Sequence, residues 1–348
     1  MSFQIKREIN TEIFMKIGIL YVCTGKYTVF WKEFYETCEK FLLPGDEKYY
    51  FVFTDAEGID YEKDNPRITK IKQPNLGWPD NTLKRYHIFV REEKKYEKMD
   101  YLYFFNGNLK LLKTIEREEF LPQDGNIMLT VHPGFYNKKN IEFPYDRNKK
   151  STAYIPIGEG DYYFAGGLNG AKTKLFLEMA KKIMECIDRD EDNNYVAIWH
   201  DESQINAYAY HHHNYQLLSP SYLYPEGWRM PFDPIILIRD KSNYGGHEQL
   251  RDGTLTEFCE NKRYLYIYGA GKKGKEIRDK LTLQGIQVKN FVVSDDQEII
   301  DNEGTIHFSQ MNTNPDETGI IIALKHEYQG TIKLICKKRG YSNVFLAF

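Results

Sequence analysis

Short apolar runs alternate with amphipathic segments along the first third of this 348-residue chain. The runs at 16–22, 48–55 and 99–105 are typical of buried strands, and the segments at 30–43 and 80–98 have the apolar spacing of helices. Strands that alternate with helices form an α/β sheet with parallel members. Ligands of such open sheets bind beyond the carboxyl ends of the strands. The loops that follow the strands are therefore where we expect a site.

The pattern restarts after a polar stretch at about residue 251. A strand, a glycine-rich turn, a helix and another strand follow each other within the last 90 or so residues, enough for a small independent fold. We therefore predict two α/β domains in the following arrangement. They are an N-terminal extension at 1–14, a large domain at 15–250, a linker at 251–262 and a small domain at 263–348.

Composition excludes several function classes. The net charge of -3 and the interspersed charges argue against a nucleic-acid partner. The five cysteines are odd in number and contain no C-x-x-C pair, so we expect reduced thiols rather than disulfides or a zinc site. No run approaches the roughly 20 apolar residues of a membrane span, and the first fourteen residues are too polar for a signal peptide.

The stretch "IWHDESQIN" is the strongest candidate for chemistry. Trp199 and His200 precede two acids, Asp201 and Glu202. An apolar ring, an imidazole and adjacent carboxylates suit a hydroxylated sugar ring and the stabilisation of an oxocarbenium-like transition state. The alternative is purely structural, because Asp201 and Gln204 have the spacing of a capping box at a helix start.

Three further motifs each have a functional and a structural interpretation. Adjacent glycines at 166 and 167 either admit a ligand close to the backbone or form a turn. His132 is either a ligand contact or a structural histidine. Asn106 and Asn108 follow an apolar strand, where they either contact a ligand or belong to a type I′ hairpin, which Asn-Gly favours.

Together these motifs resemble glycosyltransferase family 6, the histo-blood-group A/B and α1,3-galactosyltransferase family. They occur in the order WPDNTLKR, FFNGN, HPGFY, AYIP, GEGDYYFAGG, WHDES and LSPSYLYPEGW. The closer resemblance is to the bacterial branch, which has Asn-x-Asn in place of Asp-x-Asp. It spans about residues 15–250 and implies a GT-A fold. It also implies retaining transfer of GalNAc or Gal from a UDP-sugar to O3 of a β-galactoside, which usually bears an α1,2-fucose in the A and B antigens.

The resemblance implies a role for individual residues. Glu202 matches the acid at the anomeric centre, acting as a nucleophile or as a charge stabiliser, and Asp201 matches an acid that holds donor-sugar hydroxyls. Further donor-side matches are Tyr27 beside uracil, Ala165 and Gly167 beside the C2 substituent, and Asn106 and Asn108 at the metal-binding pair. His132 and Trp199 match acceptor contacts. Small residues at 165 and 167 leave room for an acetamide, so we favour UDP-GalNAc over UDP-Gal.

Two departures from the animal members affect the interpretation. Pro225 stands where an acid is expected after "SYLY", and Glu226 follows it, which weakens any acceptor role transferred to that site. The sequence begins without an N-terminal membrane anchor. We therefore expect a bacterial cytoplasmic enzyme, with peripheral association at the inner membrane as an option.

The paired asparagines raise the question of how the leaving group is stabilised. Departing UDP carries roughly two to three negative charges, which a carboxylate-bound divalent metal usually offsets. Neutral amides supply no ligand charge, but they donate hydrogen bonds. Arg85 and Lys241 are the cations that the expected fold brings near. We hypothesise transfer without a metal or another cofactor, with Lys241 as the main substitute. The alternative is that Lys241 is an ordinary solvated lysine after a strand.

The small domain contains G-x-G-x-x-G at Gly269, Gly271 and Gly274, directly after a predicted strand. Asp295 and Asp296 end the next strand, as in a dinucleotide-binding fingerprint. However, the segment is shorter than a complete six-stranded Rossmann sheet. It resembles the small Rossmann-like modules of bacterial polysaccharide enzymes. We therefore expect a structural or assembly module rather than an NAD site.

Two other functions stay open at this point. One is α1,3-galactosyl transfer from UDP-Gal, and the other is a carbohydrate- or nucleotide-binding protein without turnover, against which the retained Glu202 argues. The sequence does not determine the natural glycan acceptor, the oligomeric state, or the choice between double displacement and front-face return.

Overall fold

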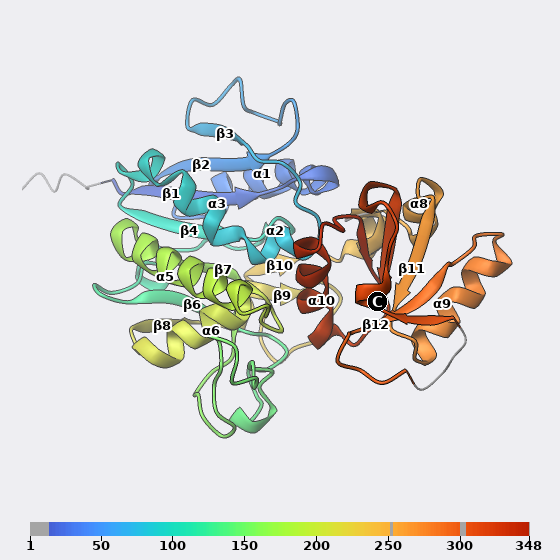
Figure 1. The fold of residues 1–348 in the computed structure, drawn as a ribbon. Helices are drawn as coiled ribbons and strands as arrows, with labels where there is room; N and C mark the ends of the chain where they lie inside the picture. The colour runs from blue at the N-terminus through green and yellow to red at the C-terminus, as the bar shows by residue number, and fades with distance from the viewer. Residues whose placement is uncertain (1–13, 251–252, 300–303, 348) are drawn as a thin grey trace, which may run out of the picture.

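The computed structural model describes residues 14–250, 253–299 and 304–347, and it confirms the α/β class (Figure 1). The strands form three sheets. The first contains β1 (Lys16–Val22), β2 (Glu47–Thr54), β3 (Ile68–Lys72), β4 (Tyr101–Phe105), β6 (Ile127–Val131), β7 (Phe164–Lys172) and β8 (Tyr215–Leu218). The second contains β5 (Leu109–Leu111), β9 (Tyr224–Pro225) and β10 (Ile236–Ile238). The third contains β11 (Tyr264–Tyr268), β12 (Asn290–Val293), β13 (Thr305–His307), β14 (Thr318–Ile322) and β15 (Val344–Leu346).

The seven-stranded sheet has the order β3-β2-β1-β4-β7-β6-β8. Strands β3, β2, β1 and β4 are parallel, whereas β7 is antiparallel to both β4 and β6. Its helices are α1 (Trp31–Phe41), α2 (Asp80–Leu83), α3 (Arg85–Arg91), α4 (Arg117–Phe120), α5 (Thr173–Asp192) and α6 (Asp201–His212). Apolar side chains of α1 pack on one face of the sheet, and those of α3 and α5 pack on the other. Both faces are covered, which explains the continuous apolar runs of the parallel strands.

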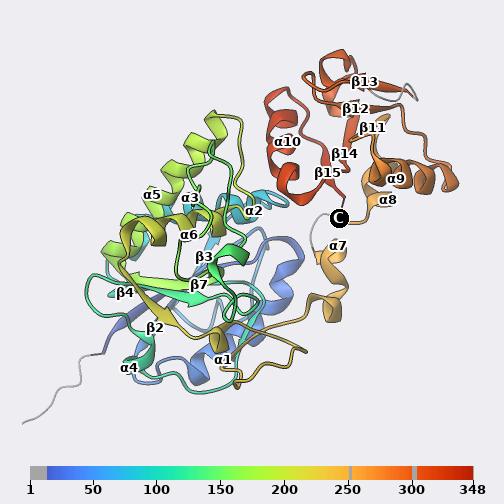
Figure 2. The same cartoon turned by 90° about the horizontal axis from the view of Figure 1, so that it is seen from below.

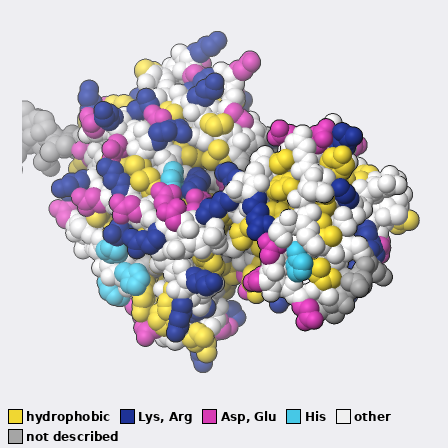
Figure 3. Space-filling view, viewed as in Figure 1, with side chains coloured by type: hydrophobic (Ala, Val, Ile, Leu, Met, Phe, Trp, Pro, Cys, Tyr) yellow, Lys and Arg dark blue, Asp and Glu magenta, His cyan; other side chains and the backbone are white. Residues whose placement is uncertain are grey.

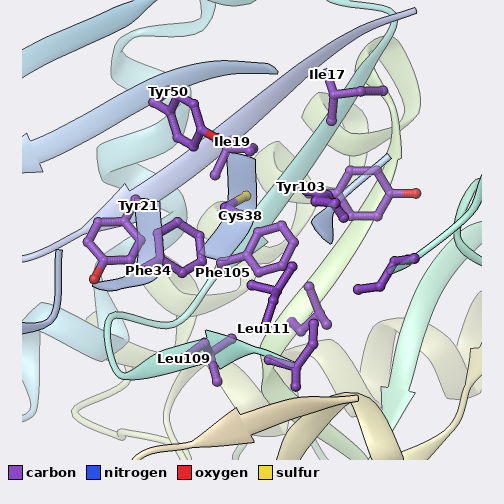
Figure 4. Close-up of a cluster of buried hydrophobic side chains, with 14 of the residues drawn as sticks. Ile17, Ile19, Tyr21, Phe34, Cys38, Tyr50, Tyr103, Phe105, Leu109 and Leu111 are labelled. Carbon is purple, nitrogen blue, oxygen red and sulfur yellow. The ribbon is translucent and has the colours of Figure 1, made fainter. Parts of the chain in front are cut away.

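An aromatic cluster fills the α1 side of the sheet (Figure 4). The rings of Tyr21 and Phe34 stack with centroids 4.5 Å apart, and Phe34 contacts Phe105 at 5.5 Å. The Tyr21 hydroxyl donates to the carbonyl of Gly107 at 2.5 Å. This bond ties the end of β1 to the loop after β4, so the two loops that approach the site are fixed to each other.

The chain changes sheets at the Asn-Gly dipeptide. Strand β4 belongs to the seven-stranded sheet, and β5 pairs with β10 in the three-stranded sheet. Neither Asn106 nor Gly107 has the positive φ that a type I′ turn requires. The hairpin alternative is therefore wrong, and Asn106 instead lies beyond the carboxyl end of a buried parallel strand.

The helix expected over 80–98 is interrupted. Helix α2 ends at Leu83, α3 covers Arg85–Arg91, and a 3-10 turn follows at Glu93–Tyr96. Lys84 at the first break has φ -91° and ψ 11°, outside the α-helical region. The break starts α3 at Arg85, whose guanidinium reaches Gly166 and Asp201 inside the protein. The break in the helix at Lys84 therefore coincides with the contacts that Arg85 makes inside the protein.

The C-terminal sheet has the order β13-β12-β11-β14-β15, and all its strands are parallel. Helices α8 (Leu255–Glu260), α9 (Lys272–Leu283) and α10 (His326–Lys338) accompany it, and α7 (Gly246–Leu250) precedes it. Residues 1–13 of the predicted extension and residues 251–252 of the predicted linker lie outside the described residues. Within the rest of that linker, α8 forms because Thr254 and Glu257 make a capping box, and Cys259 packs into the core below.

Helix α10 lies between the two parts of the molecule, beside α2 in both views (Figures 1 and 2). Lys333 Nζ donates to the carbonyl of Trp78 at 2.5 Å, and the Val196 N–H donates to Thr331 Oγ1 at 3.1 Å. On the face shown in Figure 3, basic and acidic side chains are interspersed. Within the described ranges, none of the helices has both the length and the apolar character that a bilayer crossing requires.

Candidate active site

A cleft of about 270 Å³ opens beyond the carboxyl ends of β1 and β4. The parallel strands bring their following loops to this edge of the sheet, and β7 and the start of α6 form another wall. Eight of the residues predicted for the site line this cleft. They are Tyr27, Arg85, Asn106, Gly167, Trp199, Asp201, Glu202 and Lys241.

The carboxylate of Glu202 is held at both oxygens. The Tyr163 hydroxyl donates to Oε1 at 2.7 Å, and the Gly166 N–H donates to Oε2 at 2.8 Å. Burial raises the pKa of Glu202, and these two hydrogen bonds oppose the rise. The arrangement fixes an acid whose orientation is set before any ligand arrives, as electrostatic catalysis requires.

The backbone before Glu202 is unusual. His200 has φ 57° and ψ -126°, a conformation that is uncommon for a residue with a side chain. This turn places α6 so that it begins at Asp201, with both acids in its first turn. The capping-box alternative is wrong, because Gln204 Nε2 donates to Asp190 Oδ2 at 3.0 Å and no side chain caps this helix start. Strained backbone of this kind is characteristic of functional sites.

Asp201 is fully buried and pairs with Arg85. Arg85 Nη1 lies 2.7 Å from Asp201 Oδ2 and also donates to the carbonyl of Gly166 at 3.1 Å. Burial raises the pKa of Asp201 to about 7, while the Arg85 guanidinium opposes the shift and the neighbouring Glu202 adds to it. The charge of Arg85 is therefore already engaged by a carboxylate inside the protein.

The raised pKa of Asp201 predicts an acidic limb in the activity profile. Because the folded chain holds this proton up to about pH 7, the Asp201–Arg85 ion pair is lost as the pH falls through that value. We expect kcat/KM for transfer to fall about tenfold per pH unit below about pH 7. Asp201→Asn should move or remove this limb, and an identical limb in the variant would contradict the assignment. The measurement is kcat/KM over pH 5 to 9, roughly the range in which such buried acids titrate.

Three predicted site residues lie outside the cleft lining. Ala165 is 6% exposed and packs into the apolar core. The His132 ring packs against Tyr163 and its Nδ1 accepts from the Gly134 N–H at 3.0 Å, while burial lowers the His132 pKa to about 4. Asn108 is 1% exposed and is engaged by its neighbours. The donor and acceptor contacts predicted for these three residues stay predictions.

The structure also reveals roles that the sequence interpretation did not assign. Tyr163 holds Glu202, and Gly166 both donates to that carboxylate and leaves room for it, since a Cβ there would lie 3.3 Å from Glu202 Cβ. The adjacent glycines were a usable signal for this close approach. Both glycines line the cleft, so assigning donor contacts to residues 165 and 167 omitted Gly166, whose N–H donates to Glu202.

Asn108 connects the cleft to the segment that carries Lys241. Asn106 Nδ2 donates to Asn108 Oδ1, and Asn108 Nδ2 donates to the carbonyl of Arg239, both at 2.9 Å. The Arg239 side chain pairs with Glu33 and with Glu226, whose Oε2 lies 3.1 Å from Arg239 Nε. Glu226 is therefore a partner of Arg239 rather than a residue of the cleft lining.

The cleft, the paired acids and the comparisons with known proteins define a class, the glycosyltransferases. The sequence pattern of glycosyltransferase family 6 matches residues 3–251, and the chain belongs to this family.

An Escherichia coli relative, O-antigen biosynthesis glycosyltransferase WbnI, is 34% identical over 65% of this chain and 95% of its own length. Histo-blood group ABO system transferase 1 of Rattus norvegicus is 31% identical over 61% of this chain, which spans 62% of that relative. Globoside alpha-1,3-N-acetylgalactosaminyltransferase 1 of Gallus gallus is 29% identical over 68% of this chain and 70% of that protein.

Proposed function

We propose that the chain transfers GalNAc from UDP-GalNAc in α1,3 linkage to a fucosylated β-galactoside, with retention and without a metal ion, in a bacterial cytoplasm. The observation that carries the proposal is the carboxylate of Glu202, fixed by Tyr163 and Gly166 at the wall of the cleft. In retaining transfer such a carboxylate acts as the nucleophile or stabilises the positive charge that develops at C1. The C1–O bond breaks, its electron pair leaves with UDP, and acceptor O3 ends bonded to C1. The O3 proton ends on the departing phosphate.

The choice of donor rests on space in the cleft. Gly167 lines it, and a Cβ there would make ordinary contacts at 3.5 Å with Leu223 and 3.6 Å with Asn106. The missing side chain leaves room for an acetamide group, which favours GalNAc over Gal. The Gallus gallus relative is named as an α1,3-N-acetylgalactosaminyltransferase, and we extend that linkage to this chain as part of the proposal.

The paired asparagines do not fit a divalent metal. Both hydrogen-bonding groups of the Asn108 amide are engaged, by Asn106 and by the carbonyl of Arg239. In the described parts of the chain, no group of three His, Cys, Asp or Glu side chains is placed to hold an ion. Hard cations prefer carboxylates and several oxygen ligands. We therefore assign Asn108 to positioning the Arg239–Lys241 segment, and we derive no step through a metal.

Asn108→Asp tests this assignment. The new carboxylate oxygen would face the carbonyl oxygen of Arg239, so a buried hydrogen bond is replaced by repulsion. We expect a loss of stability of roughly 3 kcal/mol and at least a tenfold lower transfer rate, which Mn²⁺ does not restore. The measurements are thermal unfolding and initial rates with and without Mn²⁺. A variant that gains manganese-dependent activity would show that position 108 is a vestigial metal site.

Lys241 is the best placed cation for the leaving diphosphate. It lines the cleft, and its Nζ lies 5.4 Å from the centre of the Tyr27 ring, the residue assigned to uracil. In the described part of the chain Lys241 makes no ion pair, whereas Arg85 is bound to Asp201. The ammonium is thus available to a ligand. A cation fixed where charge develops needs no reorganisation during the reaction.

A donor-by-acceptor matrix tests the proposed function. UDP-GalNAc and UDP-Gal are each combined with fucosylated and unfucosylated lactose, with and without chelator, and the product linkage is determined by NMR. We expect the fastest turnover with UDP-GalNAc and the fucosylated acceptor, an α1,3 product and no effect of chelator. A preference for UDP-Gal would show that the donor is UDP-Gal and not UDP-GalNAc. Turnover with none of the four pairs would overturn the proposal.

A further inference from the structure

A second and larger cavity, of about 1030 Å³, lies in the C-terminal part of the chain, outside the family match. Its walls are the loops that follow β11, β12 and β14. Because β12 and β14 lie on opposite sides of β11, the chain leaves the sheet in opposite directions at this point. Open parallel sheets bind ligands at such switch points.

The three glycines of the turn after β11 have different structural roles. Gly269 has φ +111°, which favours glycine, and a Cβ on Gly274 would lie 2.0 Å from the carbonyl oxygen of Gly269. These two glycines are required by the turn and by the close packing of α9. A Cβ on Gly271, in contrast, would meet no atom of the described residues within 4 Å. Gly271 lines the cavity, so the open space at this position is accessible to a ligand.

A buried and unpartnered polar atom in the cavity wall provides independent support. Gln329 is 2% exposed, and its Nε2 donates to the carbonyls of Leu324 at 3.0 Å and Ala347 at 2.7 Å. Among the described residues, its Oε1 has no hydrogen-bond partner, although it is buried. A buried unpaired acceptor costs about 1–3 kcal/mol. Gln329 lines the cavity, so a small shift of its side chain would bring Oε1 within reach of an amino or hydroxyl group of a ligand.

Of the residues that the structure describes, three lysines and one acid, Glu298, line the cavity, an excess of positive charge that suits an anionic ligand, and Lys273 Nζ donates to the carbonyl of Ala347 at 2.8 Å. Lys272 and Lys273 begin α9, a helix of twelve residues whose N-cap, Gly271, supplies no side-chain cap. Lys325 lies on the opposite wall. Free backbone N–H groups at a helix start favour phosphate. Asp295, the acid that a dinucleotide site would use for ribose, is already bound by the Ser309 N–H and by Arg339, each at 2.7 Å.

We propose that this cavity binds a nucleoside diphosphate, alone or as the head of a nucleotide sugar. The diphosphate lies against Gly271 and the start of α9, and Gln329 Oε1 accepts from a base amino or ribose hydroxyl group. The module is then a ligand-binding element and not only a structural one. The engaged state of Asp295 makes a dinucleotide such as NAD the weaker ligand.

The segment at 323–329, which lines the cavity, also contacts a residue of the active-site cleft. Residues 323–326 and 328–329 line the cavity, and the His326 ring stacks on Trp199 with centroids 4.4 Å apart and planes at 28°. Trp199 lines the cleft. A ligand in the cavity therefore touches the start of α10, on which the acceptor-side aromatic rests. We expect it to change the KM for the acceptor, a consequence that rests on the proposed transfer activity.

Binding is tested on the full chain by calorimetry with UDP, ADP and NAD⁺, comparing the wild type with Gly271→Val. Gly58→Val is the matched control, because a Cβ there also meets nothing within 4 Å. We expect at least one nucleoside diphosphate to bind below about 1 mM, with at least tenfold weaker binding in Gly271→Val and none of this loss in the control. For UDP, which the proposed transfer reaction also places in the active-site cleft, the diagnostic signal is a second binding event that Gly271→Val alone loses. Gly271→Ala provides a smaller change if the valine variant unfolds. Binding of none of the three nucleotides, or binding that is unchanged at position 271, would overturn the proposal.

The effect of the bound nucleotide on the acceptor KM is measured in a second experiment, so that a negative result there is distinguished from a lack of binding. The nucleotide that binds best is added to transfer assays at saturating donor, and the acceptor KM and kcat are determined. We expect at least a twofold change in acceptor KM for the wild type and no change for His326→Ala, while calorimetry still shows binding to that variant. An equal effect in both proteins, or no effect in either, would contradict the coupling.

Discussion

Glu202→Gln should lower kcat for sugar transfer by about a thousandfold or more, which corresponds to roughly 4 kcal/mol of lost transition-state stabilisation. The neutral amide can neither bond to the anomeric carbon nor offset the positive charge that develops there. The substitution preserves shape and hydrogen bonding, because the amide oxygen can accept from the Gly166 N–H while the amide nitrogen donates to the Tyr163 hydroxyl. The fold and donor binding should therefore survive.

The comparison is made under saturating donor and acceptor, with UDP release as the readout. Tyr163→Phe is the matched variant, because it leaves the charge of Glu202 in place and removes one of its two hydrogen bonds. We expect a loss of about tenfold for this variant, the usual scale of one hydrogen bond to a charged group. Turnover by Glu202→Gln within tenfold of the wild type would remove Glu202 from the centre of the mechanism.

Lys241→Ala should lower kcat by about two orders of magnitude, since one preorganised group that stabilises developing charge contributes roughly 3 kcal/mol. Lys241→Arg keeps the charge and should retain more of the rate. The loss should be largest for donors with a poor leaving group, because the ammonium acts on the charge that accumulates on the diphosphate. Initial rates and the affinity for UDP, measured in the same buffer, separate the effect on the transition state from the effect on binding.

Lys26→Ala is the control for this experiment. Lys26 lies near the same loops but is outside the cleft lining, and its Nζ is hydrogen-bonded to Gln249 at 3.2 Å. Removal of a surface charge of this kind should change the rate less than about threefold. Similar losses for Lys241→Ala and Lys26→Ala would mean that general electrostatic attraction, and not a specific contact, explains the role of Lys241.

The strands of the large sheet could be predicted because burial on both faces leaves a continuous apolar signal. Strand β1 has the predicted bounds, Lys16–Val22, and the run at 48–55 differs from β2 by one residue at each end. The interruption after Leu83 could not be predicted, because the apolar spacing over 80–98 is that of one helix, whereas the break coincides with the contacts of Arg85 with Gly166 and Asp201. Tertiary contacts override local propensity in this way.

The chemical groups of the site were easier to predict than their neighbours. Short motifs identify Asp201 and Glu202, because few patterns place two acids after an aromatic and a histidine. Gly166 was recognised only as one of two adjacent glycines, because its contact with Glu202 depends on how β7 packs against the start of α6. The role of Asn108 depends on a contact 131 residues away in the chain. A single sequence provides no signal for such a partner.

The most direct test of the account is the transfer rate of the wild type and Lys241→Ala after exhaustive treatment with chelator, before and after Mn²⁺ is added back. If a protein cation stabilises departing UDP, the chelated wild type keeps its full rate and Mn²⁺ changes it by less than about twofold. Lys241→Ala should then be slow in both conditions. A wild type that loses its activity in chelator and recovers it with Mn²⁺ would contradict the account.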